Sequence, residues 1–188
     1  ILMGNLMNAS GISYRIFDFA KAIVGWMRGG LAQANIVGSV IFAGMSGSAV
    51  ADAAGLGTVE IEAMQREGYD AETAAAVTAA SATIGPIIPP SLPMIVYGVA
   101  AETSIGALFL AGVIPGLLMA VALMVMVRHL AIRHDMPRHP FEGGRALWTS
   151  FRRAFWALMA PVVLFGGLFS GIFTPPEAAA IAVVYALV

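Results

Sequence analysis

Long apolar stretches alternate with short polar or proline-rich interruptions along most of this chain, a pattern typical of helices in a membrane. A bilayer crossing needs about 20 apolar residues. We therefore expect spans at 71–100, 104–127 and 154–173, the first of them broken by prolines. The range 31–62 is interrupted at 44–52, and it predicts either one crossing or a hairpin that returns to its starting side.

The first thirty residues predict two further pieces. Ile1–Asn8 resembles the tail of a transmembrane helix, and Ile12–Arg28 is amphipathic at 100° per residue. Its charged arc holds Arg15, Asp18, Lys21 and Arg28, and its apolar arc holds Ile12, Ile16, Phe19, Ile23, Trp26 and Met27. This pattern favours a helix in the membrane interface, although a helix packed on a protein partner has the same pattern.

Composition places the chain among integral membrane proteins. Of its 188 residues, 59% are hydrophobic and only 11% are charged, against about 25% charged in soluble domains. The net charge of −1 gives no electrostatic reason to expect a nucleic-acid partner. The sequence contains no cysteine, which excludes disulfides and thiolate metal sites. Its apolar beginning and end predict an internal segment of a longer, multi-pass protein.

The distribution of positive charge decides between the crossing and the hairpin. Lys and Arg gather on the cytoplasmic side of membrane proteins. A hairpin at 31–62 places all ten of them on one side, whereas a single crossing would split them. We therefore predict a re-entrant helical hairpin, with loops 63–70 and 128–153 in the cytoplasm. The opposite turns then carry only Glu102 and Glu177.

Four prolines interrupt the span at 71–100. Pro86, Pro89, Pro90 and Pro93 lie within eight positions, and each prevents a helical hydrogen bond to the carbonyl four residues earlier. Unpaired carbonyls persist in a membrane only where they are buried in protein or line a polar cavity. The stretch predicts a broken helix whose free oxygens hold a ligand, and a plain proline kink is the alternative.

The interruption at 44–52 offers a second set of polar groups. It contains the hydroxyls of Ser46 and Ser48, the flexible Gly44 and Gly47, and the acid Asp52. An acid inside a membrane is a functional hypothesis by default. The small residues could instead serve close helix packing, the hydroxyls could bond the nearby backbone, and Asp52 could be the N-cap of the second arm of the hairpin.

Both interruptions are expected at the same depth, and each lacks partners for its polar backbone. The broken span adds Thr83 and Ser91 to the freed carbonyls. Oxygen ligands alone suit a small, hard cation, and the N-termini of half-helices suit a carboxylate. We predict that oxygens of 46–48 approach carbonyls of 85–90 closely enough for one ion to bridge them, with Asp52 beside that point and facing protein.

Other chemistry finds no support in the sequence. A serine nucleophile at Ser46 would need a base, but His129, His134 and His139 all lie in the basic loop. No phosphate-binding loop of an ATP-driven pump is present. We therefore expect a transporter with no catalytic residues, not an enzyme.

Four motifs resemble the large membrane subunit of the TRAP transporters. They are GMSGSAVADAAGLG at 44–57, the stretch at 66–100 that contains TIGPIIPPS, SIGALFLAGVIPGLLMA at 104–120 and GIFTPPEAAA at 171–180. The resemblance covers nearly the whole chain. It implies an all-α, elevator-type secondary transporter of the bacterial inner membrane, built from inverted repeats. It also implies organic-acid uptake, of C4-dicarboxylates or sialic acids, coupled to Na⁺.

The resemblance also assigns partners and site residues. It implies a periplasmic substrate-binding protein and a small membrane subunit as partners within the lipid bilayer. The expected sodium ligands are Ser46, Gly47, Ser48, Gly85, Pro89 and Pro90, and the expected substrate contacts are Ser48, Asp52 and Ser91. The second hairpin and its broken helix would lie beyond Val188. Thr174–Glu177 predicts a helix start with a capping box.

The expected organisation has four parts. Residues 1–30 form a helix end and the interfacial helix, 31–100 the hairpin and broken helix of the transport domain, 101–153 a span and the basic loop, and 154–188 the start of a second repeat. Two alternatives stay open. One is an ion-coupled carboxylate transporter that works without a binding protein, and the other is a structural or coupling subunit of a membrane complex.

Overall fold

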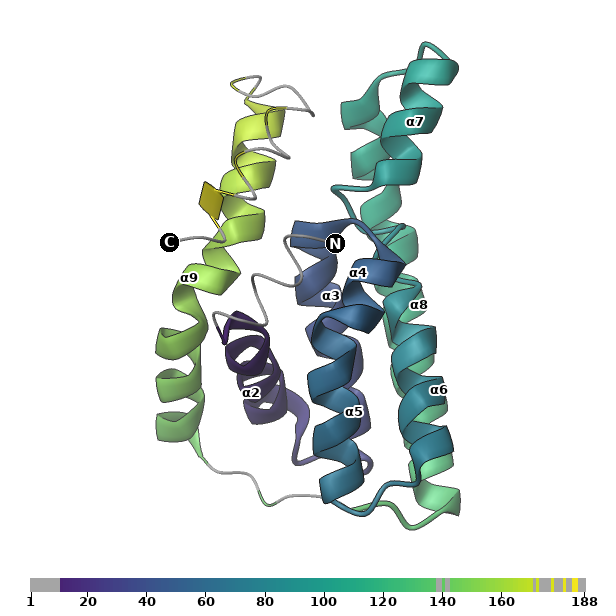
Figure 1. Ribbon diagram of the computed structural model, residues 1–188, viewed down its shortest axis with the longest axis vertical. Helices are drawn as coiled ribbons and strands as arrows, with labels where there is room; N and C mark the ends of the chain where they lie inside the picture. Colours follow the sequence, from purple (N-terminus) through teal and green to yellow (C-terminus); the bar gives the residue numbers. More distant parts are fainter. Residues whose placement is uncertain are drawn as a thin grey trace.

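The computed structural model describes residues 11–137, 140, 143–170, 172, 177, 181, 184 and 185. In this part of the chain the regular elements are helices (Figure 1). They are α2 (Ile12–Val24), α3 (Gly30–Ser46), α4 (Ala49–Ala54), α5 (Leu56–Arg66), α6 (Ala71–Ala82), α7 (Leu92–Ala100), α8 (Ile105–Arg133) and α9 (Gly144–Phe169). The predicted helix tail at 1–8 and the capping box at 174–177 fall wholly or mostly outside the described residues.

Among the described residues, two helices are long and apolar enough to cross a membrane. They are α8 and α9, with 29 and 26 residues. Both helices continue into the predicted basic loop at 128–153, because α8 ends at Arg133 and α9 begins at Gly144. Arg128 and Arg133 belong to the end of α8, and Arg145, Arg152 and Arg153 to the start of α9. Charged residues end the apolar stretch of a membrane helix, but Arg has good helix propensity and does not end the helix itself.

Helices α3 and α5 form an antiparallel pair. Gly38 in the middle of α3 faces Leu56 and Glu60 of α5. Tyr69, just after α5, points its hydroxyl toward the backbone of Leu31 and Ala32 at the start of α3. The chain therefore rises through α3, turns over at α4 and returns through α5 to the end at which it began (Figure 1).

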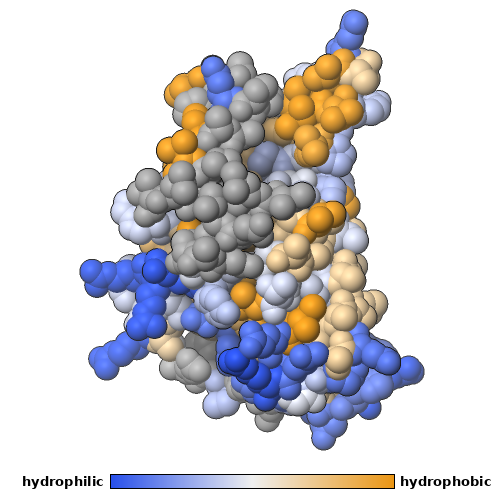
Figure 2. Space-filling model, viewed as in Figure 1, coloured by the Kyte–Doolittle hydropathy of each residue, from blue (hydrophilic) through white to orange (hydrophobic). Residues whose placement is uncertain are grey.

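Several connections lie at that same end of the molecule. Gly29, in the α2–α3 turn, packs against Ala131 near the end of α8. The α5–α6 turn, the end of α8 and the start of α9 lie at the lower end of Figure 1, whereas the α7–α8 turn lies at the upper end. Figure 2 shows hydrophilic residues gathered toward the lower end of this face and hydrophobic residues toward the upper end.

The amphipathic helix is shorter than predicted and buries a different face. It ends at Val24, because the chain turns at Gly25, instead of continuing to Arg28. Its buried residues are Ser13, Ile16, Phe17, Ala20 and Val24. Of the predicted apolar arc, Ile16 is buried but Trp26 is 51% exposed. Helix α2 packs against α3 and α9, and Lys21 forms an ion pair with Glu67 at the end of α5, with 3.4 Å between nitrogen and oxygen.

A buried hydrogen-bond network joins α3 to α6. The side-chain amide of Asn35 donates to the Thr78 hydroxyl at 2.7 Å, and its carbonyl oxygen accepts from the Ser81 hydroxyl at 2.5 Å. All three side chains are buried. The network fixes the hairpin against the first half of the broken helix.

We expect Asn35→Ala to lower the free energy of unfolding of the full-length subunit by about 2–4 kcal/mol, because both hydroxyls lose a buried partner. The loss should be visible as a lower Tm in detergent. Thr103→Ala is the control, since it removes an exposed hydrogen bond to Ala101 and should change stability by about 0.5 kcal/mol or less. Equal Tm values for the two variants would contradict this role of the network.

Candidate ion and substrate site

The predicted interruption of the hairpin is narrower than the sequence indicates. Helix α3 runs through Ser46 and ends at Gly47, whose φ of 59° lies in the left-handed region. The chain is extended at Ser48, and α4 begins at Ala49. A second break follows at Gly55, between α4 and α5. The tip is therefore two sharp turns around one short helix, and the predicted irregular segment at 44–52 is mostly helical.

Ser48 is the N-cap of α4, because its hydroxyl accepts from the amide of Ala51 at 3.3 Å. The interpretation of Asp52 as an N-cap was wrong, since Asp52 lies one turn inside α4. The possibility that the tip hydroxyls bond the nearby backbone is confirmed for Ser48. The Ser46 hydroxyl differs, as it is buried and has no hydrogen-bond partner. The hydroxyl oxygen of Ser46, at the tip of the hairpin, therefore makes no hydrogen bond within the described residues.

The broken helix is confirmed. Helix α6 ends at Ala82, and α7 begins at Leu92 after nine residues of turns and bends. The Pro89–Pro90 peptide bond is cis. Two of the carbonyls expected to be free are paired: that of Ala82 accepts from the Gly85 amide at 3.1 Å, and that of Pro86 accepts from the Ser91 hydroxyl. Tight turns and a side chain thus replace part of the lost helical bonding.

Ser91 is the N-cap of α7 and is fully buried. Its hydroxyl donates to Pro86 and accepts from the Met94 amide at 3.3 Å. The two half-helices that leave the breaks, α4 and α7, therefore both begin at a capping serine. This parallel is not evident from the sequence, where the surroundings of Ser48 and Ser91 have little in common.

The structure brings the two breaks into direct contact. A Cβ atom placed on Gly47 would lie 1.9 Å from the carbonyl oxygen of Pro90. A Cβ atom on Gly85 would lie 3.2 Å from the carbonyl carbon of Ser48 and 3.3 Å from the amide nitrogen of Ala49. The backbones therefore approach closely at two points, and at Gly47 a side chain does not fit unless the backbone of Pro90 moves. The hairpin tip and the broken helix are therefore in contact, with the Pro90 carbonyl oxygen against Gly47.

Helix α8 packs against the irregular segment of the broken helix through two glycines that are one turn apart. A Cβ atom on Gly112 would lie 2.5 Å from the carbonyl oxygen of Ile87, and one on Gly116 would lie 2.4 Å from the side chain of Ile88. Small residues four apart let helices approach closely in membranes. The Gly112–Gly116 spacing therefore lets α8 press against the irregular segment.

Asp52 faces protein, as predicted, with 1% of its surface exposed. Ser39 of α3 is the polar side chain facing it, but neither carboxylate oxygen has a hydrogen-bond partner. Ser39 precedes Gly47 by eight residues, which is about 12 Å of helix. The Asp52 carboxyl group thus points into the interior of the hairpin.

Glu60 is absent from the site residues predicted from the sequence. Glu60 is fully buried, and its oxygens have no hydrogen-bond partner. A signal was available: Leu56, Glu60 and Met64 are four residues apart and share the buried face of α5. The other acids near the end of α5, Glu62 and Glu67, are paired with Arg66 and Lys21.

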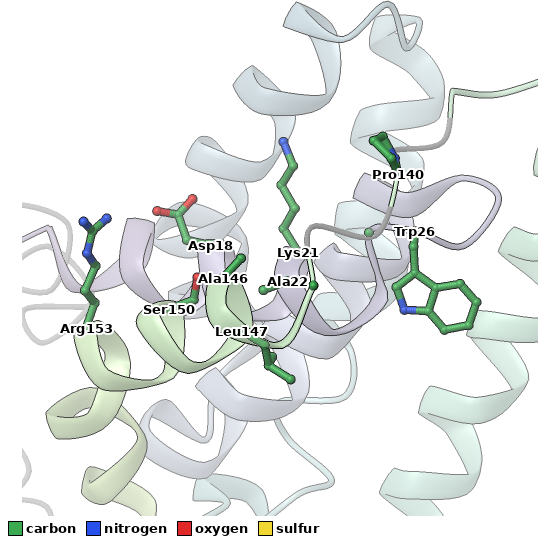
Figure 3. A pocket seen from close by; sticks show the side chains of 11 residues that line it. Asp18, Lys21, Ala22, Trp26, Pro140, Ala146, Leu147, Ser150 and Arg153 are labelled. Atoms are coloured by element: carbon green, nitrogen blue, oxygen red, sulfur yellow. The ribbon is translucent and has the colours of Figure 1, made fainter.

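A separate pocket of about 260 Å³ lies between α2 and α9. Figure 3 shows that side chains of both helices line it, among them Asp18, Lys21, Ser150 and Arg153. None of the predicted site residues contributes to it. The candidate site is therefore the contact between the two breaks, and this pocket lies elsewhere. Within the described residues, no group of three or more acidic or histidine side chains could hold a metal.

Two apolar helices of membrane-spanning length, together with a turned-back helix that meets a broken helix, define this chain as part of a helical membrane protein. The whole chain, residues 1–188, matches the family described as "Tripartite ATP-independent periplasmic transporter, DctM component". The chain belongs to this family of transporters, which confirms the resemblance noted in the sequence.

Three proteins of similar sequence are named as permeases of TRAP transporters. The chain is 51% identical over 187 residues to the sialic acid TRAP transporter large permease protein SiaM of Vibrio cholerae, and 49% identical over 188 residues to the sialic acid TRAP transporter permease protein SiaT of Haemophilus influenzae. It is 44% identical over 185 residues to the C4-dicarboxylate TRAP transporter large permease protein DctM of Pseudomonas aeruginosa. These matches cover 100%, 100% and 98% of the chain but only 44%, 30% and 43% of the relatives. The chain thus spans less than half the length of these relatives.

Proposed function

We propose that this chain is part of the large membrane subunit of a sodium-coupled transporter that imports organic acids into a bacterial cell. The observation that carries the proposal is the close approach of Gly47, between α3 and α4, to the carbonyl oxygen of Pro90 in the broken helix. Broken half-helices that meet inside the membrane are the recurrent ion and substrate site of secondary transporters.

The residues at the contact have distinct proposed roles. The free hydroxyl of Ser46, the hydroxyl of Ser48 and the backbone of Gly47 would hold Na⁺ from one side. The backbone at Gly85, Pro89 and Pro90 would hold it from the other. A hydroxyl that accepts one hydrogen bond keeps a second lone pair for a cation. Ser48, Asp52 and Ser91 would contact the substrate.

The arrangement also supports a topology. We propose that α3 and α5 form a re-entrant hairpin, so that the lower end of Figure 1 faces the cytoplasm. The α5–α6 turn and the end of α8, which carry Arg66, Arg128 and Arg133, lie there, in agreement with the preference of positive charge for that side. The hairpin and α6 would move together in an elevator motion, because the network around Asn35 joins them.

The names of the relatives suggest substrates and partners. We propose that a periplasmic binding protein delivers the substrate and that a small membrane subunit completes the transporter in the inner membrane. The two relatives named for sialic acid are 49% and 51% identical to this chain, whereas the dicarboxylate relative cited above is 44% identical to it. This difference favours a sialic acid over a C4-dicarboxylate as the first substrate to test.

The proposal predicts that uptake requires sodium. The full-length subunit, with its small subunit and binding protein, is reconstituted in vesicles and given labelled sialic acid or succinate. Uptake should stop when external Na⁺ is replaced by K⁺. Uptake at an equal rate in K⁺ would refute the sodium coupling, and uptake without the binding protein would favour the alternative transporter class.

The same assay tests Ser48 as a ligand. Ser48→Ala should raise the sodium concentration for half-maximal uptake about fivefold, the equivalent of roughly 1 kcal/mol for one lost ligand. Ser104→Ala is a matched control, because Ser104 caps α8 as Ser48 caps α4, at the same 3.3 Å, but is exposed. It should lose a similar capping energy and leave the sodium dependence unchanged.

A further inference from the structure

The side chain of Glu60 has no function in the proposed sodium and substrate site. It has 0% of its surface exposed, and neither of its oxygens has a hydrogen-bond partner. The helices of this chain seal it by themselves.

The structure shows how the carboxyl group is accommodated. A Cβ atom on Gly38 would lie 2.7 Å from the Oε1 atom of Glu60 and 3.1 Å from the side chain of Leu56. Gly38 therefore leaves the space that the carboxyl group fills against the backbone of α3. On this side Oε1 lies against a glycine, and it has no hydrogen-bond partner among the described residues.

The charges around Glu60 offer no compensation. Helix α3 contains no titratable residue, and α6 carries only Glu72, exposed in its first turn, and the capping Asp70 before it. Helix α2 contributes the charged residues Arg15, Asp18 and Lys21. Lys21 is paired with Glu67, and Arg66 of α5 with Glu62. The charge that acts on Glu60 is that of Asp52 in α4, which has the same sign.

An ionised carboxylate without a partner is costly to bury, and a second negative charge nearby increases the cost. A metal cation would need several oxygen ligands, which the Gly38 side of Glu60 does not provide. We propose that Glu60 binds a proton and stays an uncharged acid. The hairpin thus contains a proton-binding site in addition to the contact between the breaks.

This site would link protonation to the state of Asp52. Two acids that interact release their protons in coupled steps. A cation or proton that neutralises Asp52 removes the repulsion and makes it easier for Glu60 to lose its proton. The proposal does not depend on sodium as the coupling ion, because it rests on the burial of Glu60 and on the lack of a hydrogen-bond partner for its carboxyl group among the described residues.

Infrared spectroscopy of the purified full-length subunit tests the site directly. A protonated carboxyl group has a C=O stretching band that an ionised carboxylate lacks. At pH 7 the wild type and Glu62→Gln should show such a band, and Glu60→Gln should lose it. Glu62 is the matched control, because it lies two residues away on α5 but is exposed and paired with Arg66. An unchanged band in Glu60→Gln would overturn the proposal.

Thermal stability gives a second, independent result. Glutamine has the shape and hydrogen-bonding groups of the uncharged acid and needs no proton, so Glu60→Gln should fold and have a higher Tm at pH 7 than the wild type, whose unfolded chain releases the Glu60 proton. As the pH rises above the ordinary pKa of a glutamate, about 4.3, the unfolded wild type releases this proton while the folded protein keeps it, so the wild type should lose stability with pH and the variant should lack this loss. A Glu60→Gln protein that fails to fold, or that loses stability with pH as the wild type does, would count against the proposal. Neither the infrared nor the thermal measurement depends on transport, so a negative result in the sodium test would not bear on the proposal for Glu60.

Discussion

Gly47→Ala should abolish organic-acid uptake by the complete transporter. The new Cβ atom would lie 1.9 Å from the carbonyl oxygen of Pro90, which is a backbone atom and cannot move by a rotamer change. Overpacking of this kind costs about 1–3 kcal/mol, and the left-handed φ of 59° adds about 1–2 kcal/mol for a residue with a side chain. The contact between the breaks must open, and the proposed sodium ligands separate with it.

Gly68→Ala separates the effect of the steric clash from the effect of the left-handed backbone conformation. Gly68 has a φ of 89°, so it bears a backbone penalty as well, but a Cβ atom there would meet nothing within 4 Å. This variant should be somewhat less stable and should transport sodium-dependently at a rate near that of the wild type. If Gly47→Ala transports as well as Gly68→Ala, the contact between the breaks is not required for uptake.

Gly112→Ala should strongly impair both stability and uptake, although alanine normally favours a helix. The added methyl group would lie 2.5 Å from the Ile87 carbonyl oxygen and 2.5 Å from the Met94 side chain. Met94 can move, but the Ile87 carbonyl belongs to the break itself. The break must therefore shift away from α8. We expect a lower Tm and a higher sodium concentration for half-maximal uptake.

Gly106→Ala is the matched control in the same helix. A Cβ atom on Gly106 approaches only the Ser104 hydroxyl, at 3.9 Å. Alanine is about 1 kcal/mol better than glycine in a helix, so this variant should equal or exceed the wild type in Tm and transport normally. A Gly112→Ala protein that is also stabilised would show that α8 does not support the break.

The sequence by itself determined where the helices are interrupted. Proline lacks an amide donor and excludes the preceding helical turn, so the break at 83–91 follows from local chemistry. The glycine at position 47 likewise permits the left-handed turn that ends α3. The apolar length of α8 and α9 and the reversal of the hairpin also follow from composition and from the placement of positive charge. These features depend on residues that are neighbours along the chain.

Only the tertiary structure decided which polar groups are satisfied and which are not. Ser48 and not Asp52 caps α4, Ser91 pairs with Pro86, and the buried face of α2 differs from its apolar arc. Glu60 has the sequence context of an exposed helix end, yet Gly38 from a different helix makes room for it. Burial and hydrogen bonding of this kind depend on which helices meet. Contacts between residues far apart in the chain create them, and no local pattern encodes such a contact.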